Sequence, residues 1–76
     1  MSGRPVKHSV TLHGHRTSIS LEDEFWWAFR EIAQKKDITI NALTAEIDTA
    51  RGDLGLASAI RIYVLKYFQE QAVNGG

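Results

Sequence analysis

The sequence has no cysteine, one proline and no long apolar run. Without cysteine the chain can form neither a disulfide nor a thiolate zinc site. No stretch of about 18 apolar residues is available to cross a membrane, and the N-terminus lacks the apolar segment that follows the charged start of a secretory signal. We therefore expect a cytoplasmic protein with no membrane partner.

The chain is also short. A domain of 76 residues buries too little of its surface to be comfortably stable alone. With no disulfide available, oligomerisation is the usual remaining device. Two Trp, three Phe and two Tyr would leave apolar surface exposed in so small a monomer. We expect a homodimer.

Acidic residues are missing from the first 20 positions, which carry Arg4, Lys7, Arg16 and three histidines. All nine acids follow Leu21, against six Lys or Arg. This asymmetry is typical of a chain in which one part contacts a polyanion, although an ordinary basic tail has the same composition. We expect a flexible basic arm at 1–7, one domain at 8–72 and a disordered tail at 73–76.

Strand character is confined to residues 8–21. Residues 16–21 alternate strictly, which places Thr17, Ile19 and Leu21 on one face and Arg16, Ser18 and Ser20 on the other. Val10 and Leu12 alternate in the opposite phase, and Gly14 lies between the two segments. The sequence leaves two readings open here, a single bulged strand and a short hairpin.

Three helices follow. The first begins after Leu21 with an acidic first turn and closes at 34–37. The second has Thr39 as its N-cap and ends near 51–52. Asp53 is expected to cap the third, which runs from Leu56 to about Gln71. Apolar residues surround so much of this third helix that we expect it to be buried on more than one side, and hence to meet a partner molecule.

This order of elements resembles the ribbon-helix-helix superfamily, and in particular a group of small bacterial single-domain members. The segments that carry the resemblance are His15–Glu22, the aromatic-rich first helix, Ile40–Leu43 and Ser58–Arg61, so that it covers roughly residues 8–68. It implies a mainly α fold with one short N-terminal strand, in an intertwined homodimer whose two strands form an antiparallel ribbon. The core shared by both subunits would then contain Ile19, Leu21, Phe25, Phe29, Leu43, Ile47, Ile60 and Val64.

The resemblance also implies a DNA-binding transcriptional regulator, for example a repressor. The outward ribbon positions that enter the major groove in such proteins correspond here to Arg16, Ser18 and Ser20. The N-terminus of the second helix anchors phosphates in the family, because its free N–H groups favour an anion. The residues assigned to phosphate contact are Thr39, Ile40, Asn41, Lys7 and Lys35.

The sequence also allows two alternative functions. In the first, the fold serves as an antitoxin-like or scaffold module and the third helix holds a protein partner. In the second, His13 and His15 project from one strand face and bind a metal, although no further ligand lies near them in the sequence. We expect neither a metal nor another cofactor. A phosphate loop and a nucleophile with its base are both missing, so we expect no enzyme.

Overall fold

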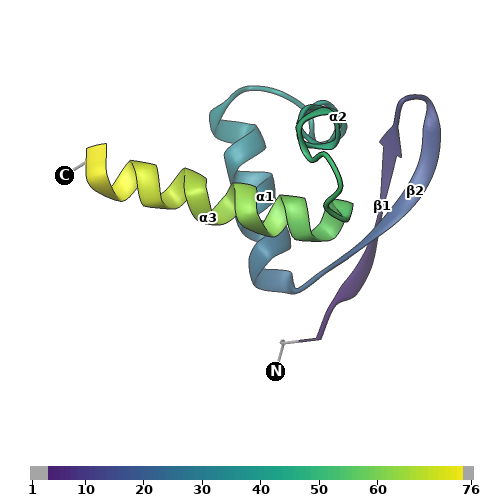
Figure 1. Cartoon of the computed structure of the whole chain (residues 1–76), viewed down its shortest axis with the longest axis horizontal. Coiled ribbons are helices and arrows are strands. Elements are labelled where there is room, and N and C mark those ends of the chain that lie inside the picture. The colour runs from purple at the N-terminus through teal and green to yellow at the C-terminus, as the bar shows by residue number, and fades with distance from the viewer. Residues whose placement is uncertain (1–3, 75–76) are drawn as a thin grey trace.

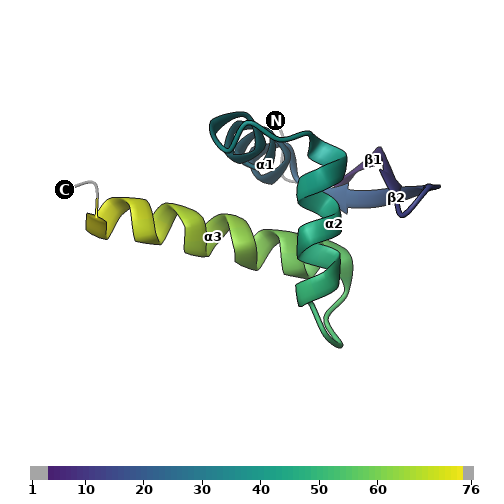
Figure 2. The same ribbon diagram turned by 90° about the horizontal axis from the view of Figure 1, so that it is seen from above.

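The computed structural model describes residues 4–74, which form a hairpin followed by three helices (Figures 1 and 2). The elements are β1 (Val6–Leu12), β2 (His15–Leu21), α1 (Asp23–Lys35), α2 (Ile40–Ala50) and α3 (Leu56–Asn74). The hairpin lies beside α2 at one side of the molecule, and α3 runs away from it to the opposite side.

The strands β1 and β2 pair with each other within one chain. His13 and Gly14 form the two-residue loop, and both have positive φ, 52° and 80°. Positive φ at both central residues is the feature of the type I′ turn, whose twist matches that of paired strands. Of the two readings left open, the structure has the hairpin. It therefore differs from the expected single strand per chain, because the ribbon closes without a second subunit.

The ends of the chain also differ from the expected boundaries. β1 begins at Val6, so Val6 and Lys7 belong to the hairpin rather than to an arm. α3 continues through Val73 to Asn74, within the segment expected to be a disordered tail. Residues 1–3 and 75–76 of the expected arm and tail lie outside the described residues.

Local sequence accounts for the ends of the first two helices. Asp37, with φ 58°, follows α1, and the N–H groups of Asp37 and Ile38 donate to Gln34 and Ala33. These two bonds form a Schellman motif around a left-handed residue. Thr39 Oγ1 then accepts the Ala42 N–H over 3.0 Å, which confirms Thr39 as the N-cap of α2.

The start of α3 corrects one expectation. Asp53 does not cap this helix, because α3 begins at Leu56 and its first-turn bond runs from the Ala59 N–H to the Gly55 carbonyl over 2.9 Å. Asp53 instead lies in the connection between α2 and α3, next to Gly52 with φ 61°. Aspartate is a common N-cap residue, but here the helix begins three positions after it.

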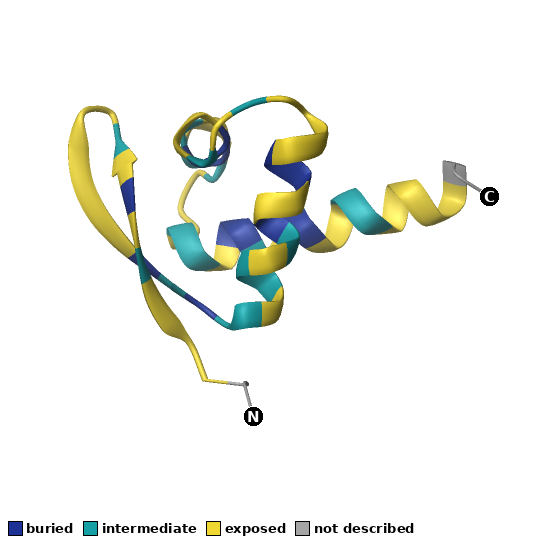
Figure 3. Ribbon diagram, turned by 180° about the vertical axis from the view of Figure 1, so that it is seen from behind, coloured by how far each residue is buried: buried dark blue, intermediate teal, exposed yellow. Residues whose placement is uncertain are grey.

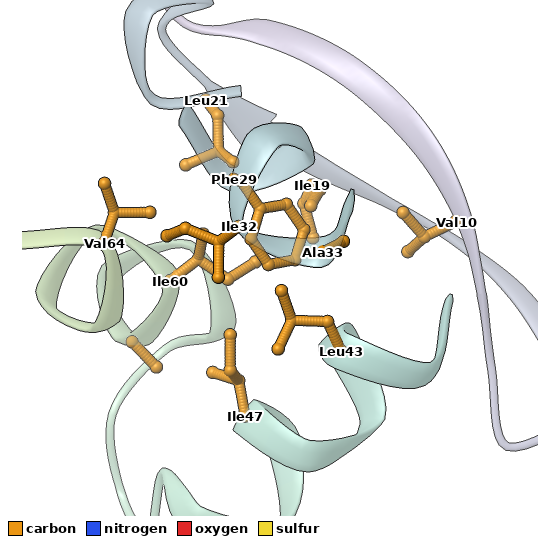
Figure 4. Packing of buried hydrophobic residues seen from close by; sticks show 11 residues of the cluster. Val10, Ile19, Leu21, Phe29, Ile32, Ala33, Leu43, Ile47, Ile60 and Val64 are labelled. Carbon is orange, nitrogen blue, oxygen red and sulfur yellow. The ribbon is translucent and has the colours of Figure 1, made fainter. Parts of the chain in front are cut away.

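One hydrophobic core lies between the inner face of the hairpin and the three helices (Figures 3 and 4). Seven of the eight residues assigned to a shared dimer core are buried within this single chain, and Phe25 is half-buried at its edge. The side chains in Figure 4 converge from β2, α1, α2 and α3. The buried core residues are Val10, Ile19, Leu21, Phe29, Ile32, Ala33, Leu43, Ile47, Ala59, Ile60 and Val64.

Candidate nucleic-acid interface

The outer face of the hairpin is entirely polar. Residues paired across an antiparallel ladder share a face, and the register joins Lys7 to Ser20, Ser9 to Ser18 and Thr11 to Arg16. Of the residues that alternate with them, Val10, Ile19 and Leu21 are buried in the core. The outer face thus carries two cations, three serines, one threonine and no carboxylate.

The structure brings together the three residues assigned to base contact. Arg16 and Ser18 are exposed, whereas Ser20 is half-buried at the base of the hairpin. Ser9 and Thr11 share their face, and the sequence reasoning missed them. The signal was present, because a turn at Gly14 places the residues that alternate with Val10 and Leu12 on the same face as Arg16 and Ser18.

Lys7, assigned to phosphate contact, lies on the same outer face opposite Ser20. Lys35, assigned the same role, forms an exposed ion pair with Glu31 one helical turn earlier, at 3.2 Å. The neighbouring Lys36 donates to the Tyr63 hydroxyl over 3.3 Å, and this hydrogen bond raises the pKa of the Lys36 ammonium group. Lys35 and Lys36 thus already have partners within the chain, and Lys7 on the hairpin is the more accessible cation for a phosphate.

The N-terminus of α2 lies against the outer edge of β1. Thr39 Oγ1 already accepts the Ala42 N–H, so the first-turn amides left for an anion are those of Ile40 and Asn41. The Asn41 side chain has a different role, because its Oδ1 accepts the Thr11 backbone N–H over 3.0 Å. Asn41 therefore fixes the hairpin to α2 with its side chain and keeps only its backbone amide for a phosphate.

A second contact holds the tip of the hairpin. The His13 ring lies 3.2 Å from an Asp48 carboxylate oxygen on α2, and Arg51 Nε donates to the other oxygen of the same group over 2.6 Å. These two hydrogen bonds, Arg51 foremost, lower the pKa of Asp48. The tip and the edge of the hairpin are thus both tied to α2.

The three histidines lie in different surroundings. His13 and His15 do not share a strand face as expected, because His13 occupies the turn of the hairpin. The His8 ring stacks on the Trp26 ring, with 4.0 Å between the two centroids. Within residues 4–74 there is no group of three or more potential metal ligands.

The base of the hairpin is held by α3, which the sequence reasoning did not foresee. Arg61 donates to both carboxylate oxygens of Glu22, at 2.9 and 3.3 Å, and to the Ser20 carbonyl at 3.4 Å. The hydrogen bond from Arg61 is the main reason that the pKa of Glu22 lies below its ordinary value. Arg61 and Glu22 are 39 positions apart, and no local pattern in the sequence predicts their contact.

The model of a family described as ribbon-helix-helix domain matches residues 5–68. The chain belongs to the ribbon-helix-helix family. No curated protein and no solved structure matches it. Ribbon-helix-helix proteins are generally dimerising DNA-binding regulators, and the match covers the hairpin, all of α1 and α2, and most of α3.

The helices of this ribbon-helix-helix chain differ in length, and α3 is the longest at 19 residues. In the part of the protein described here, residues 4–74, no helix is both long and apolar enough to span a membrane.

Proposed function

We propose that this chain is a sequence-specific DNA-binding transcriptional regulator that acts as a homodimer. The observation that carries the proposal is the outer face of the hairpin, which presents Lys7 and Arg16 among short hydroxyl side chains and has no carboxylate. The major groove admits a two-stranded β-ribbon, and every base pair shows a distinct hydrogen-bond pattern there. A face of this shape and charge suits that groove.

The proposed dimer uses the open edge of β2. Backbone groups in an antiparallel pair point alternately toward and away from the partner strand. The Thr11 N–H points away, since it reaches Asn41, so its partner Arg16 is also a position whose N–H and C=O leave the pair. By the same alternation the backbone N–H and C=O groups of Ser18 and Ser20 point away from β1. Of these groups, the Ser20 carbonyl accepts a hydrogen bond from Arg61. A second β2 would satisfy this edge.

Pairing of two β2 strands would place Arg16, Ser18 and Ser20 of both copies at the centre of a four-stranded sheet. With strands about 4.8 Å apart, the two outer β1 strands would lie about 14 Å from each other. This separation is close to the major-groove width of about 12 Å, so β1 would run along the phosphate edges. The central residues would then read bases, and Lys7 would contact phosphate.

The N-terminus of α2 adds a second phosphate contact in this proposal. Its first-turn amides at Ile40 and Asn41 lie beside β1, and a phosphate there would be favoured by the positive end of the helix dipole. Such contacts fix the register of the protein on the duplex without reading its sequence. Thr39 supports the site indirectly by capping the helix. Lys35, four positions earlier in the sequence, would have to exchange its exposed ion pair with Glu31 for a phosphate.

The test begins with selection of a binding sequence from a random duplex library, followed by fluorescence anisotropy across a salt series. We expect log affinity to fall linearly with log salt, as phosphate neutralisation requires. Arg16→Ala should cost about 1 to 3 kcal/mol on the selected duplex. Arg16→Lys keeps the charge but loses the bidentate contact, so it should retain binding to scrambled DNA and lose preference for the selected duplex.

Two results would contradict the proposal. No binding at low salt would remove DNA as the partner, and the chain would then be examined as a protein-interaction module. Equal affinity of the unsubstituted chain and Arg16→Ala for the selected duplex would remove the outer face of the hairpin from the interface, even if DNA binding were real.

A further inference from the structure

Helix α3 has a face that this chain leaves uncovered. Its inner side packs on the core through Ile60 and Val64, whereas Ile62 is 40% exposed, Leu65 56% and Val73 80%. The C-terminal half of α3 projects past α1 and α2 in both views (Figures 1 and 2). Helical spacing places the exposed apolar residues along one stripe, together with Lys66, Gln69 and Glu70.

Two charged side chains, Lys66 and Glu70, lie along this stripe. Lys66 and Glu70 are exposed, and neither forms an ion pair with any residue in the range 4–74. They are one cation and one anion, four positions apart, on the same flank of the stripe. Lys66, Gln69, Glu70 and Val73 together line a groove on the surface of α3.

We propose that the exposed stripe of α3 pairs antiparallel with the same stripe of a second copy of this chain. In an antiparallel pair centred on Phe68, Lys66 of each copy lies opposite Glu70 of the other, so two ion pairs form about one two-fold axis. The same pairing brings Ile62 of each copy against the turn that holds Val73 of the other. The stripe is therefore self-complementary in both charge and hydrophobicity.

The charges also set the orientation and register. A parallel pair in register would place each Lys66 beside its equivalent and each Glu70 beside its equivalent, which is repulsive. A shift of the antiparallel pair by one turn would likewise bring like charges together. Only the antiparallel arrangement centred near Phe68 joins opposite charges on both sides of the axis.

This contact is separate from the open edge of β2 and does not depend on DNA binding. The hairpin lies at one side of the molecule and the projecting end of α3 at the other (Figure 2). If both surfaces are used, each α3 pair joins two β2-paired dimers, which produces tetramers or longer assemblies.

The test uses charge reversal, read as mass by sedimentation velocity over a concentration series. Lys66→Glu places two carboxylates opposite each other on each side of the axis, and Glu70→Lys does the same with two ammonium groups. We expect each single variant to raise the dissociation constant of the α3 contact about tenfold. Gln71→Glu, on the opposite side of the helix, serves as the charge control and should leave the mass unchanged.

Mixing the two single variants shows whether the charges act between chains or within one helix. An equimolar mixture of Lys66→Glu and Glu70→Lys restores both ion pairs between unlike chains, so we expect the association lost by each to return. A repulsion confined to one helix would not be relieved by mixing. Failure of the mixture to associate more tightly than either variant alone would overturn the inference.

The β2 contact is separated by carrying out the same series in a Ser18→Pro background. Proline removes an N–H at the open edge without removing a bond to β1. If the inference holds, Ser18→Pro remains a dimer through α3 and becomes a monomer when Lys66→Glu is added. If Ser18→Pro perturbs folding by circular dichroism, the comparison is made in the unsubstituted background, where the α3 contact is read as a change from tetramer to dimer.

Discussion

The Thr11 backbone N–H donates to Asn41 Oδ1 over 3.0 Å and joins the outer edge of the hairpin to the first turn of α2. The two residues are 30 positions apart. Through this bond the polar face proposed to read bases is held in a fixed position beside the helix N-terminus proposed to bind phosphate. Asn41 therefore fixes the edge of the hairpin beside this helix N-terminus, while His13 and Arg61 hold its tip and its base.

Replacing this side chain should loosen the interface. Because the bond is exposed, Asn41→Ala should lower the free energy of unfolding by about 0.5 kcal/mol, measured by urea denaturation. Asn41→Asp keeps an acceptor for Thr11 and should retain stability, while its negative charge beside the proposed phosphate weakens DNA binding. Equal DNA affinity for Asn41→Asp and the unsubstituted chain would remove the α2 N-terminus from the phosphate site.

Gly14 supports the turn of the hairpin through its backbone alone. A Cβ added there meets nothing within 4 Å, so only the φ of 80° opposes a side chain. Gly14→Ala should therefore cost about 1 kcal/mol in urea denaturation. Gly14→Asn should cost less, because asparagine tolerates this region of φ. A Gly14→Ala chain as stable as the original would mean that the turn does not require positive φ.

Asp37 should respond in the opposite direction. It holds a φ of 58° at the end of α1 and its side chain has no hydrogen bond or ion pair within residues 4–74, so glycine would fill the same Schellman position without steric cost. We expect Asp37→Gly to raise the free energy of unfolding by up to about 1 kcal/mol. Asp37→Ala, which keeps a Cβ, is the matched comparison and should give no such gain. A destabilised Asp37→Gly would contradict the prediction.

The Arg61–Glu22 pair should appear as a pH dependence. Because the pKa of Glu22 lies below its ordinary value of 4.5, the pair stabilises the fold fully above that pH. This stabilisation is lost as the pH falls through the lowered pKa of the folded state. Arg61→Gln should return the Glu22 pKa toward 4.5, as measured by NMR titration of the carboxyl group.

Arg51→Gln provides the control for that experiment. It removes the main cause of the lowered pKa at Asp48 and should raise that pKa alone, leaving Glu22 unchanged. If the Glu22 pKa moved equally in both variants, a general change in the charge of the protein would explain the effect, and the specific pair would not.

Much of the fold followed from periodicity and from residues that act locally. Alternation at residues 16–21 separated the buried Ile19 and Leu21 from the exposed Arg16 and Ser18, because a strand turns successive side chains to opposite faces. The cap at Thr39 was also readable, because its bond reaches only three residues along the chain. The resemblance to the family rests on the short segments 15–22, 40–43 and 58–61 and on the aromatic-rich first helix, and the match over residues 5–68 confirms it.

What the sequence alone determined is which residues prefer a strand, a helix or a turn and which of their faces is apolar, since these depend on neighbours within a few positions. The tertiary structure decided where those faces meet. It paired Val6–Leu12 with His15–Leu21 inside one chain, because His13 adopts a positive φ that its residue type does not announce. It also joined Thr11 to Asn41, a contact that exists only once distant segments pack.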